Sequence, residues 1–291
     1  MHHSPVAPDI DTLEFSKRFF IGIGAARSGT TWLDAVLRQH PEIHLTRIKE
    51  LHYFNWALLN EPAPLPMSVA LKAKDWILRP GAQERLLNTF YENKYMRRFL
   101  LRGQPNHRWY FRLFRDMPEQ DICGEFTPAY ATLPEPLIAE IARLVPHARL
   151  IFVMRDPVER LWSHYRYQIG KGVMSKDDIS SDPNRFFASR TNYMETIEKY
   201  EKYFPVEQIF YGYYEEFIAE PERRFNDLCA FLGVSAVNDD MQKMLTQRIN
   251  ASREDNECPT DLRADLVAQF GHLAGQLEEK LGRVPPSWRE K

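Results

Sequence analysis

The chain has 291 residues, of which 44% are hydrophobic and 27% charged, and its formal net charge is −2. This composition fits one large α/β domain, and the charge excludes a global electrostatic attraction to nucleic acid or to anionic membranes. The three cysteines are scattered without a CxxC spacing, which argues against a disulfide framework and a zinc site and favours a reducing compartment.

Residues 1–17 contain acids and prolines and no apolar core of signal-peptide length, and we expect them to form a flexible leader. Residues 18–291 are predicted to form a single domain. No stretch approaches the ~20 apolar residues of a membrane span. We therefore expect a cytoplasmic protein without a transmembrane segment.

Strand-like and helix-like segments alternate along the chain. Strands are predicted at residues 18–23, 122–125, 149–154 and 209–213. Helices are predicted at residues 30–39, 83–101, 108–115, 136–144, 221–232 and 261–281, with one more beginning at Asp156-Pro157, and a Pro-rich loop at 61–66. The alternation predicts a three-layer α/β fold with a central parallel sheet flanked by helices.

The first strand leads into FFIGIGAARSGTTWL, residues 19–33, where a Gly-punctuated loop precedes a helix with hydroxylated first residues. Backbone N–H groups and the positive end of a helix dipole would form a phosphate cradle there. Gly24 and Gly29 have the Walker A separation, but Thr30 stands where that motif needs Lys, and Arg27 lies inside the loop. The sequence therefore favours a nucleotide with a different transferable group over a nucleoside triphosphate.

Three predicted strands end in polar residues, and ligands of open α/β sheets bind beyond the carboxyl ends of the strands. The first strand is followed by the loop that contains Arg27, and the second ends in EFT at residues 125–127. The third is followed by Arg155, with Ser163 and His164 on the next predicted helix. An Arg at a strand end and a Ser on the next helix can converge on a second anion. Two anion sites on one edge indicate a nucleotide with phosphates at both the 5′ and the 3′ positions.

These motifs carry a family resemblance. GAARSGTTWL and VMRDPVERLWSHY resemble the paired nucleotide signatures of sulfotransferases that depend on 3′-phosphoadenosine 5′-phosphosulfate (PAPS). IKELHYFNW is similar to the KExHFF-type segment of the heparan-sulfate and bacterial branch, and EFTPAY, YYEEFIAEPERRFNDLCAFLGV and RINASRED follow in that family's order. The resemblance spans about residues 19–283. It implies a P-loop NTPase-like fold and transfer of a sulfuryl group from PAPS, with release of 3′-phosphoadenosine 5′-phosphate (PAP) and no metal required.

The resemblance also implies roles for matching residues. Glu50 would be the general base with His52 beside it, and Arg27 would stabilise charge on the bridging oxygen. The 3′-phosphate would be bound by Arg155 and Ser163. The full implied donor-binding set is Arg27, Ser28, Gly29, Thr30, Thr31, Trp32, Arg155, Ser163 and Arg253.

Two departures and several alternatives stay open. Arg27 stands where many members have Lys, and Phe126 replaces a Lys of some heparan-sulfate enzymes, which weakens the case for a glycosaminoglycan acceptor. Glu50 could instead be a solvated carboxylate paired with Lys49, or His52 could be the base; Glu125 is expected to anchor a loop. The aromatic residues Trp56, Trp109, Tyr110 and Phe111 fit either an acceptor cleft or a core.

The acceptor implied by the resemblance is a glycan, lipid or small molecule, and the oligomeric state, a homodimer included, is open. Two other function classes remain. One is a P-loop kinase-like ATP-dependent phosphotransferase that uses Mg²⁺, against which the missing Walker Lys argues. The other is a nucleotide sensor that kept the fold but lost transfer.

Overall fold

The structure is a computed structural model that describes residues 17–56, 106–175, 188–245 and 257–289. Its central sheet has five strands in the order β2-β3-β1-β4-β5, and each neighbouring pair is parallel. The strands are β1 (Arg18–Gly24), β2 (Ile43–Leu45), β3 (Ile122–Phe126), β4 (Arg149–Met154) and β5 (Ile209–Tyr213). Because all the strands run the same way, their carboxyl ends meet at one edge of the sheet, as predicted.

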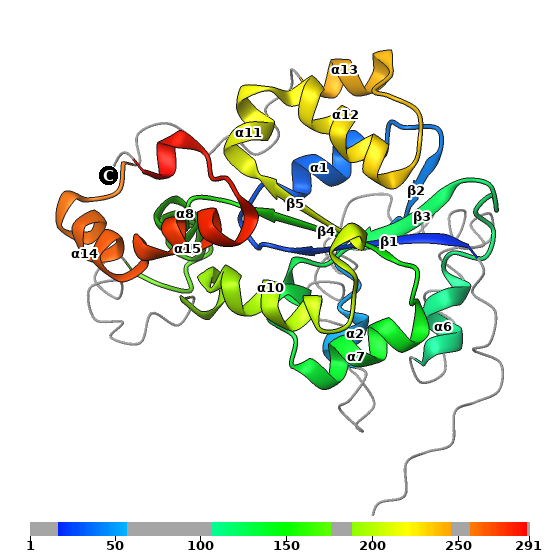
Figure 1. Ribbon diagram of the computed structural model, residues 1–291, viewed down its shortest axis with the longest axis horizontal. Helices are drawn as coiled ribbons and strands as arrows, with labels where there is room; N and C mark the ends of the chain where they lie inside the picture. Colours follow the sequence, from blue (N-terminus) through cyan, green and yellow to red (C-terminus); the bar gives the residue numbers. More distant parts are fainter. Residues whose placement is uncertain (1–16, 57–105, 176–187, 246–256, 290–291) are drawn as a thin grey trace, which may run out of the picture.

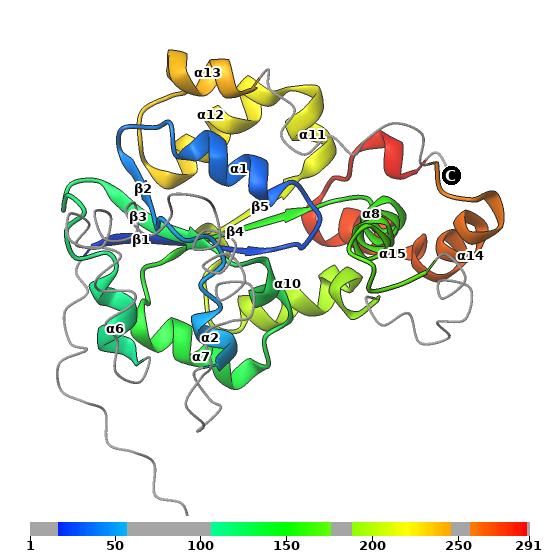
Figure 2. The same ribbon diagram turned by 180° about the vertical axis from the view of Figure 1, so that it is seen from behind.

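Helices cover both faces of the sheet (Figures 1 and 2). One face carries α1 (Thr30–Leu37), α11 (Tyr214–Ala219), α12 (Pro221–Leu232) and α13 (Asp239–Leu245). The other carries α2 (Tyr53–Trp56), α6 (His107–Arg112), α7 (Glu135–Leu144) and α10 (Tyr193–Glu201). At the left of Figure 1 lie α8 (Pro157–Gly170), α14 (Thr260–Phe270) and α15 (His272–Leu281). The predicted three-layer α/β class is confirmed.

Short 3₁₀ turns connect these elements: η2 (Pro128–Thr132), η3 (Ala188–Thr191), η4 (Val206–Gln208) and η5 (Pro286–Trp288). The turn η2 directly follows β3, and η3 directly precedes α10. Both turns contribute neighbours to the site described below.

The two cores follow from the alternation of side chains along β1. Phe19, Ile21 and Ile23 belong to the core under α7 and α10, whereas Phe20 belongs to the core under α1 and α12. Successive strand residues point to opposite faces, and both faces of a parallel sheet are covered by helices. The strand therefore reads as an unbroken apolar run in the sequence.

Several boundaries differ from the prediction. The strand β2 was not predicted, because three residues with His44 in the middle give no strand periodicity. The helix predicted at residues 261–281 is divided at Gly271 into α14 and α15. The segments 1–16, 61–66 and 83–101 lie outside the described residues. The division into a leader and one domain stays a prediction.

Candidate active site

The loop after β1 has a conformation that only glycine adopts readily at residue 29. Gly29, which precedes the first residue of α1, has φ of 77°, in the left-handed region. A Cβ atom there would lie 2.6 Å from Cδ2 of Tyr214. Both the backbone conformation and the lack of space therefore require glycine.

The first turn of α1 presents unpaired hydrogen-bond donors. The backbone N–H groups of Gly29, Thr30 and Thr31 have no acceptor within the part of the chain that the structure describes. Ser28 is fully buried, with 0% of its surface exposed. Its hydroxyl oxygen has no hydrogen-bond partner among the described residues. Helix N-termini with free N–H groups bind phosphate-like anions, so we refer to residues 28–31 as the anion cradle.

The residues predicted to form the two anion sites lie next to each other. Arg27 Nε donates a hydrogen bond to Ser163 Oγ at 3.4 Å, and Arg155 Nη1 donates one to the Arg27 carbonyl oxygen at 3.5 Å. Arg155 also lies 3.9 Å from the Glu159 carboxylate. Asp156 caps α8, because its Oδ1 accepts a hydrogen bond from the Glu159 N–H at 2.9 Å.

Positive charge is concentrated at this point of a chain that is nearly neutral overall. Burial, and then the charges of Arg160, Arg190 and Arg27, lower the pKa of His164 to about 3. The His164 imidazole is therefore neutral at physiological pH. Burial is also the main cause of the lowered pKa of the Arg27 guanidinium, although its side chain reaches the surface. Such a field attracts a polyanionic ligand.

Two tyrosines that were not predicted complete this side of the site. The Arg27 guanidinium carbon lies 4.6 Å from the centre of the Tyr167 ring, and that of Arg155 lies 5.0 Å from the Tyr214 ring. Tyr167 lies four residues after Ser163 on α8, a spacing that places both on one face of the helix. That spacing was available in the sequence.

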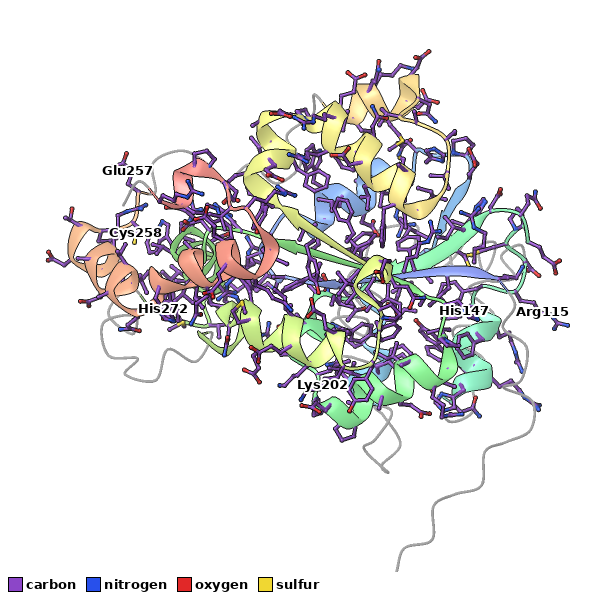
Figure 3. The ribbon with its side chains drawn as sticks, in the orientation of Figure 1. Arg115, His147, Lys202, Glu257, Cys258 and His272 are labelled. Carbon is purple, nitrogen blue, oxygen red and sulfur yellow. The ribbon has the colours of Figure 1, made fainter. Side chains whose placement is uncertain are left out.

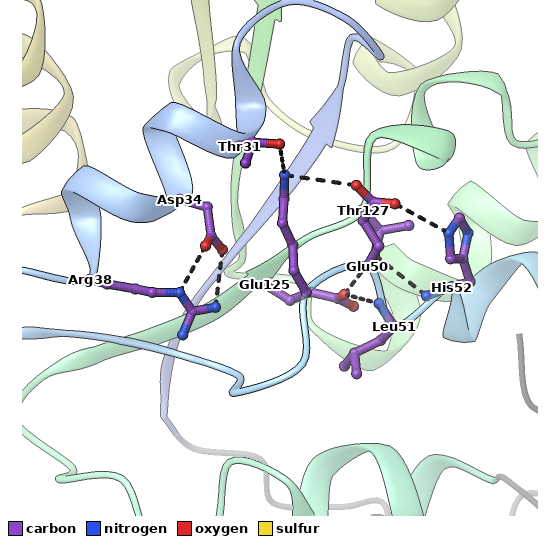
Figure 4. Close-up of polar contacts among 9 residues, drawn as sticks. Thr31, Asp34, Arg38, Glu50, Leu51, His52, Glu125 and Thr127 are labelled. Carbon is purple, nitrogen blue, oxygen red and sulfur yellow. Dashed lines mark hydrogen bonds and ion pairs between the residues drawn. The ribbon is translucent and has the colours of Figure 1, made fainter. Parts of the chain in front are cut away.

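The candidate base lies on the other side of the cradle, in the loop after β2. The Glu50 Oε2 atom is 3.8 Å from His52 Nε2 (Figure 4). His52 Nδ1 is 3.1 Å from Asn55 Oδ1. The Glu50 and His52 side chains are 33% and 23% exposed. The carboxylate and the imidazole are therefore both accessible to a ligand at the sheet edge.

The buried carboxylate of Glu125 anchors this loop, as predicted. Glu125 Oε2 accepts hydrogen bonds from the Leu51 N–H at 3.4 Å and from the Thr127 hydroxyl at 2.7 Å. Glu125 Oε1 accepts from the hydroxyls of Tyr110 and Tyr130, at 2.7 and 3.1 Å. Burial raises the pKa of Glu125, and these four hydrogen bonds oppose the shift.

The candidate catalytic residues also have an unusual backbone conformation. In the described residues, the non-glycine positions with φ in the left-handed region are Arg27, Glu50 and His52, at 70°, 61° and 54°. Such conformations cost roughly 1–3 kcal/mol each and cluster at functional sites. All three are the residues to which the sequence assigned catalysis.

One lysine connects the two sides. Lys49 Nζ donates a hydrogen bond to Thr31 Oγ1 at 2.8 Å and lies 3.7 Å from Glu50 Oε1. The sequence indicated Lys49 only as a partner of Glu50. Its reach to α1 depends on the path of the loop across the sheet edge, which no local motif encodes.

Several residues named in the sequence analysis lie in the core or outside the described residues. The Trp32 side chain is 7% exposed and packs edge-on against Phe225 in the core, and its role in donor binding stays a prediction. Trp109 and Tyr110 are likewise core residues. Arg253 lies outside the described residues, and so does the side chain of Trp56.

The described residues contain no group of three or more His, Cys, Asp or Glu side chains that could hold a metal ion. Among the helices that the structure describes, none has the length and apolarity needed to cross a membrane. The three cysteines, Cys123, Cys229 and Cys258, are buried and free.

Two solved structures have the same fold. The sulfotransferase from Alicyclobacillus acidocaldarius superposes with a TM-score of 0.67 at 24% identity, covering 94% of this chain and 99% of that one. The sulfotransferase domain from the Synechococcus PCC 7002 olefin synthase gives 0.55 at 16% identity, covering 93% of this chain and 95% of that one. At these identities the likeness shows the fold.

Sequence relatives share a shorter region. The membrane-associated sulfotransferase kil1 of Dictyostelium discoideum is 28% identical over 150 residues, which are 52% of this chain and 23% of that protein. The heparan sulfate glucosamine 3-O-sulfotransferase 3B1 of Homo sapiens is 27% identical over 143 residues, 44% of this chain and 35% of that protein. The matches thus span well under half of either relative. Residues 19–239, however, match the profile of the sulfotransferase family, and the chain therefore belongs to that family.

Proposed function

We propose that the protein transfers the sulfuryl group of PAPS to a hydroxyl or amine of a glycan or small-molecule acceptor. One observation carries the proposal: a cradle of unpaired N–H groups lies opposite a carboxylate, with Lys49 between them. Its Nζ donates to Thr31 at 2.8 Å and lies 3.7 Å from Glu50 Oε1. A donor whose phosphosulfate occupies the cradle would present its transferable group to the base.

The chemistry needs positioning and charge stabilisation more than covalent catalysis. The acceptor oxygen or nitrogen forms a bond to sulfur while the bond from sulfur to the bridging oxygen breaks. The electron pair of the broken bond stays on the 5′-phosphate of PAP, and Glu50 takes the acceptor proton. Arg27, at the mouth of the cradle, would stabilise the charge that develops on the bridging oxygen. No metal is assigned, because a sulfuryl group carries less negative charge than a phosphoryl group.

Selectivity for a 3′-phosphorylated nucleotide is assigned to Arg155 and Ser163. Both lie beside the cradle, and the arginines around them supply the field that a second phosphate needs. Arg253 is proposed as a further contact to that phosphate from the sequence resemblance alone.

The family resemblance assigns the base to Glu50, and the contacts of His52 fit a supporting role. If the neutral His52 ring donates from Nδ1 to Asn55 Oδ1, its Nε2 carries no proton and can accept one. That Nε2 atom lies 3.8 Å from Glu50 Oε2, where a proton received by the carboxylate could pass on to the ring. His52 then orients Glu50 or relays its proton.

The kinase-like alternative is not favoured. The chain belongs to the sulfotransferase family, and Thr30 occupies the position of the Walker lysine. Within the family, the acceptor, the cytoplasmic location and a homodimer stay predictions.

Two measurements test the proposal. Retention on immobilised adenosine 3′,5′-bisphosphate should exceed retention on an ATP resin, and free PAP should elute the protein. Transfer of label from [³⁵S]PAPS should then be screened against glycans, phenols and cell extracts. A protein that binds ATP as well as PAP, and that transfers no label, would contradict the proposal.

A further inference from the structure

Lys49 occupies the space between the cradle and the candidate base. Its ammonium nitrogen is 2.8 Å from Thr31 Oγ1 on the first turn of α1 and 3.7 Å from Glu50 Oε1. Only 13% of its side chain is exposed, compared with 33% for Glu50. A lysine that is this well covered, with its ammonium between two functional elements, is positioned more closely than a surface lysine.

The backbone explains how Lys49 and Glu50 reach the same point. Neighbouring residues of an extended chain point to opposite sides. The left-handed conformation of Glu50, with φ of 61°, breaks this alternation. The segment is then held against β3, because the Glu50 N–H donates to the Phe126 carbonyl at 3.0 Å and the Leu51 N–H donates to Glu125.

The site also needs a cation at this point for an electrostatic reason. The ionised Glu50 carboxylate and the phosphosulfate in the cradle are both anions, and they must approach closely for the acceptor to lie between them. Their repulsion would weaken donor binding and would favour protonation of the base. In the described residues, the charged groups that act on Glu50 include Lys49, Arg27 and Arg190, and the His52 imidazole joins them when it is protonated.

The loop position at which many family members carry a lysine is Arg27 here, and two other positions at which a lysine could stand hold different residues. Thr30 stands in place of the Walker lysine. The Phe126 side chain is 1% exposed and packs where a Cβ on Gly22 would lie, so position 126 faces the core and not the site. Lys49 thus supplies the lysine ammonium nearest the base in the described residues.

We propose that Lys49 is a catalytic residue that contacts the sulfuryl oxygens of bound PAPS and offsets their repulsion with Glu50. This inference rests on the proposed function. In it, the ammonium leaves Thr31 for the sulfuryl group when the donor binds, and it keeps its proton throughout. PAP lacks the sulfuryl group, so Lys49 distinguishes the donor from the product.

The test compares Lys49→Met, which removes the charge at similar length, with Lys49→Arg, which keeps it. Lys202→Met is the control, because Lys202 pairs with Glu135 on the surface, away from the cradle, and is labelled in Figure 3. Binding of [³⁵S]PAPS is measured by filter assay at 4 °C without acceptor, and binding of PAP by calorimetry. Thermal unfolding verifies that each variant is folded.

Lys49→Met is expected to bind PAPS about ten- to a hundredfold more weakly, as for the loss of a charged hydrogen bond, with PAP affinity unchanged. Lys49→Arg should restore part of the loss, and Lys202→Met should match the wild type. Equal weakening of both ligands, or no weakening of either, would overturn the role of Lys49. If the wild type binds neither ligand, the proposed function itself has failed.

An acceptor identified by the label screen adds a second readout. The acid limb of the pH–kcat profile should move to higher pH in Lys49→Met, because the charge that favours the ionised base is gone. A purely structural lysine would lower kcat without moving that limb.

Discussion

Arg27 Nε donates a hydrogen bond to Ser163 Oγ at 3.4 Å and so joins the loop after β1 to the helix after β4. The residue assigned to the leaving group therefore contacts a residue assigned to the 3′-phosphate. Binding of the 3′-phosphate of PAPS is thereby linked to stabilisation of the charge that develops at its 5′ end. Substitutions at the two positions should nonetheless separate in the measurements that follow.

Arg27→Ala should lower kcat much more than it weakens PAP binding, because PAP carries no bridging oxygen on which charge develops. The barrier should rise by about 2–4 kcal/mol, as for one preorganised donor. Turnover of labelled PAPS and calorimetry with PAP measure the two effects. Arg143→Ala is the control, since Arg143 pairs with Glu140 on α7. Unchanged turnover in Arg27→Ala would remove Arg27 from the mechanism.

Arg155→Ala and Ser163→Ala should each weaken PAPS and PAP binding by about 1.5–3 kcal/mol, the range for a hydrogen bond to a charged group. Affinity for adenosine 5′-phosphosulfate should hardly change, because that nucleotide has no 3′-phosphate. Competition binding with the three nucleotides makes the comparison. Equal loss of affinity for all three nucleotides would mean that Arg155 and Ser163 do not bind the 3′-phosphate.

Glu50→Gln preserves the shape of the side chain but cannot take a proton. We expect near-normal PAP affinity and thermal stability, with kcat reduced ~10²–10⁴-fold. The acid limb of the pH–kcat profile should vanish with the carboxylate. The competing result is high activity in Glu50→Gln together with none in His52→Ala, which would assign the base to His52.

His164 should make the folded protein sensitive to acid. Its pKa is lowered from 6.5 to about 3 by burial and by nearby arginines, so between these values the unfolded chain binds the proton more readily. The free energy of unfolding should therefore fall as the pH decreases from 6.5 towards 3. Urea unfolding of the wild type and His164→Gln should show a smaller fall in the variant. Parallel curves would mean that His164 titrates normally in the folded state.

Much of the fold was predictable because its signals are local. The strand β4 has both predicted bounds, and Asp156 caps α8 where the Asp-Pro pair indicated. The strand β2 was not predictable, since its three residues are held by pairing with β3 and not by their own pattern.

Site residues were predictable where a sequence motif corresponds to one backbone turn. They were not predictable where their place depends on the direction of a side chain or on a contact between residues distant in the sequence. Residues 28–31 lie at the start of α1, where the motif indicated a helix, and their role in anion binding stays a prediction. Trp32 follows them in sequence, but the helical rotation turns its side chain into the core against Phe225. Lys49 was overlooked as a site residue, because its contact with Thr31 joins the loop after β2 to helix α1, which are separated in the chain.

The strand order has a consequence for how this enzyme can diversify. The loop with Glu50 follows β2, the cradle follows β1, and Arg155 follows β4, so β1 and β3 separate the acceptor side from the 3′-phosphate side. Distant sites without shared partners usually combine additively. Under the proposed assignments, substitutions at residues 52–55, which leave Lys49 and Glu50 in place, are expected to alter acceptor choice while leaving nucleotide choice intact. New acceptors would then need no matching change beyond β4.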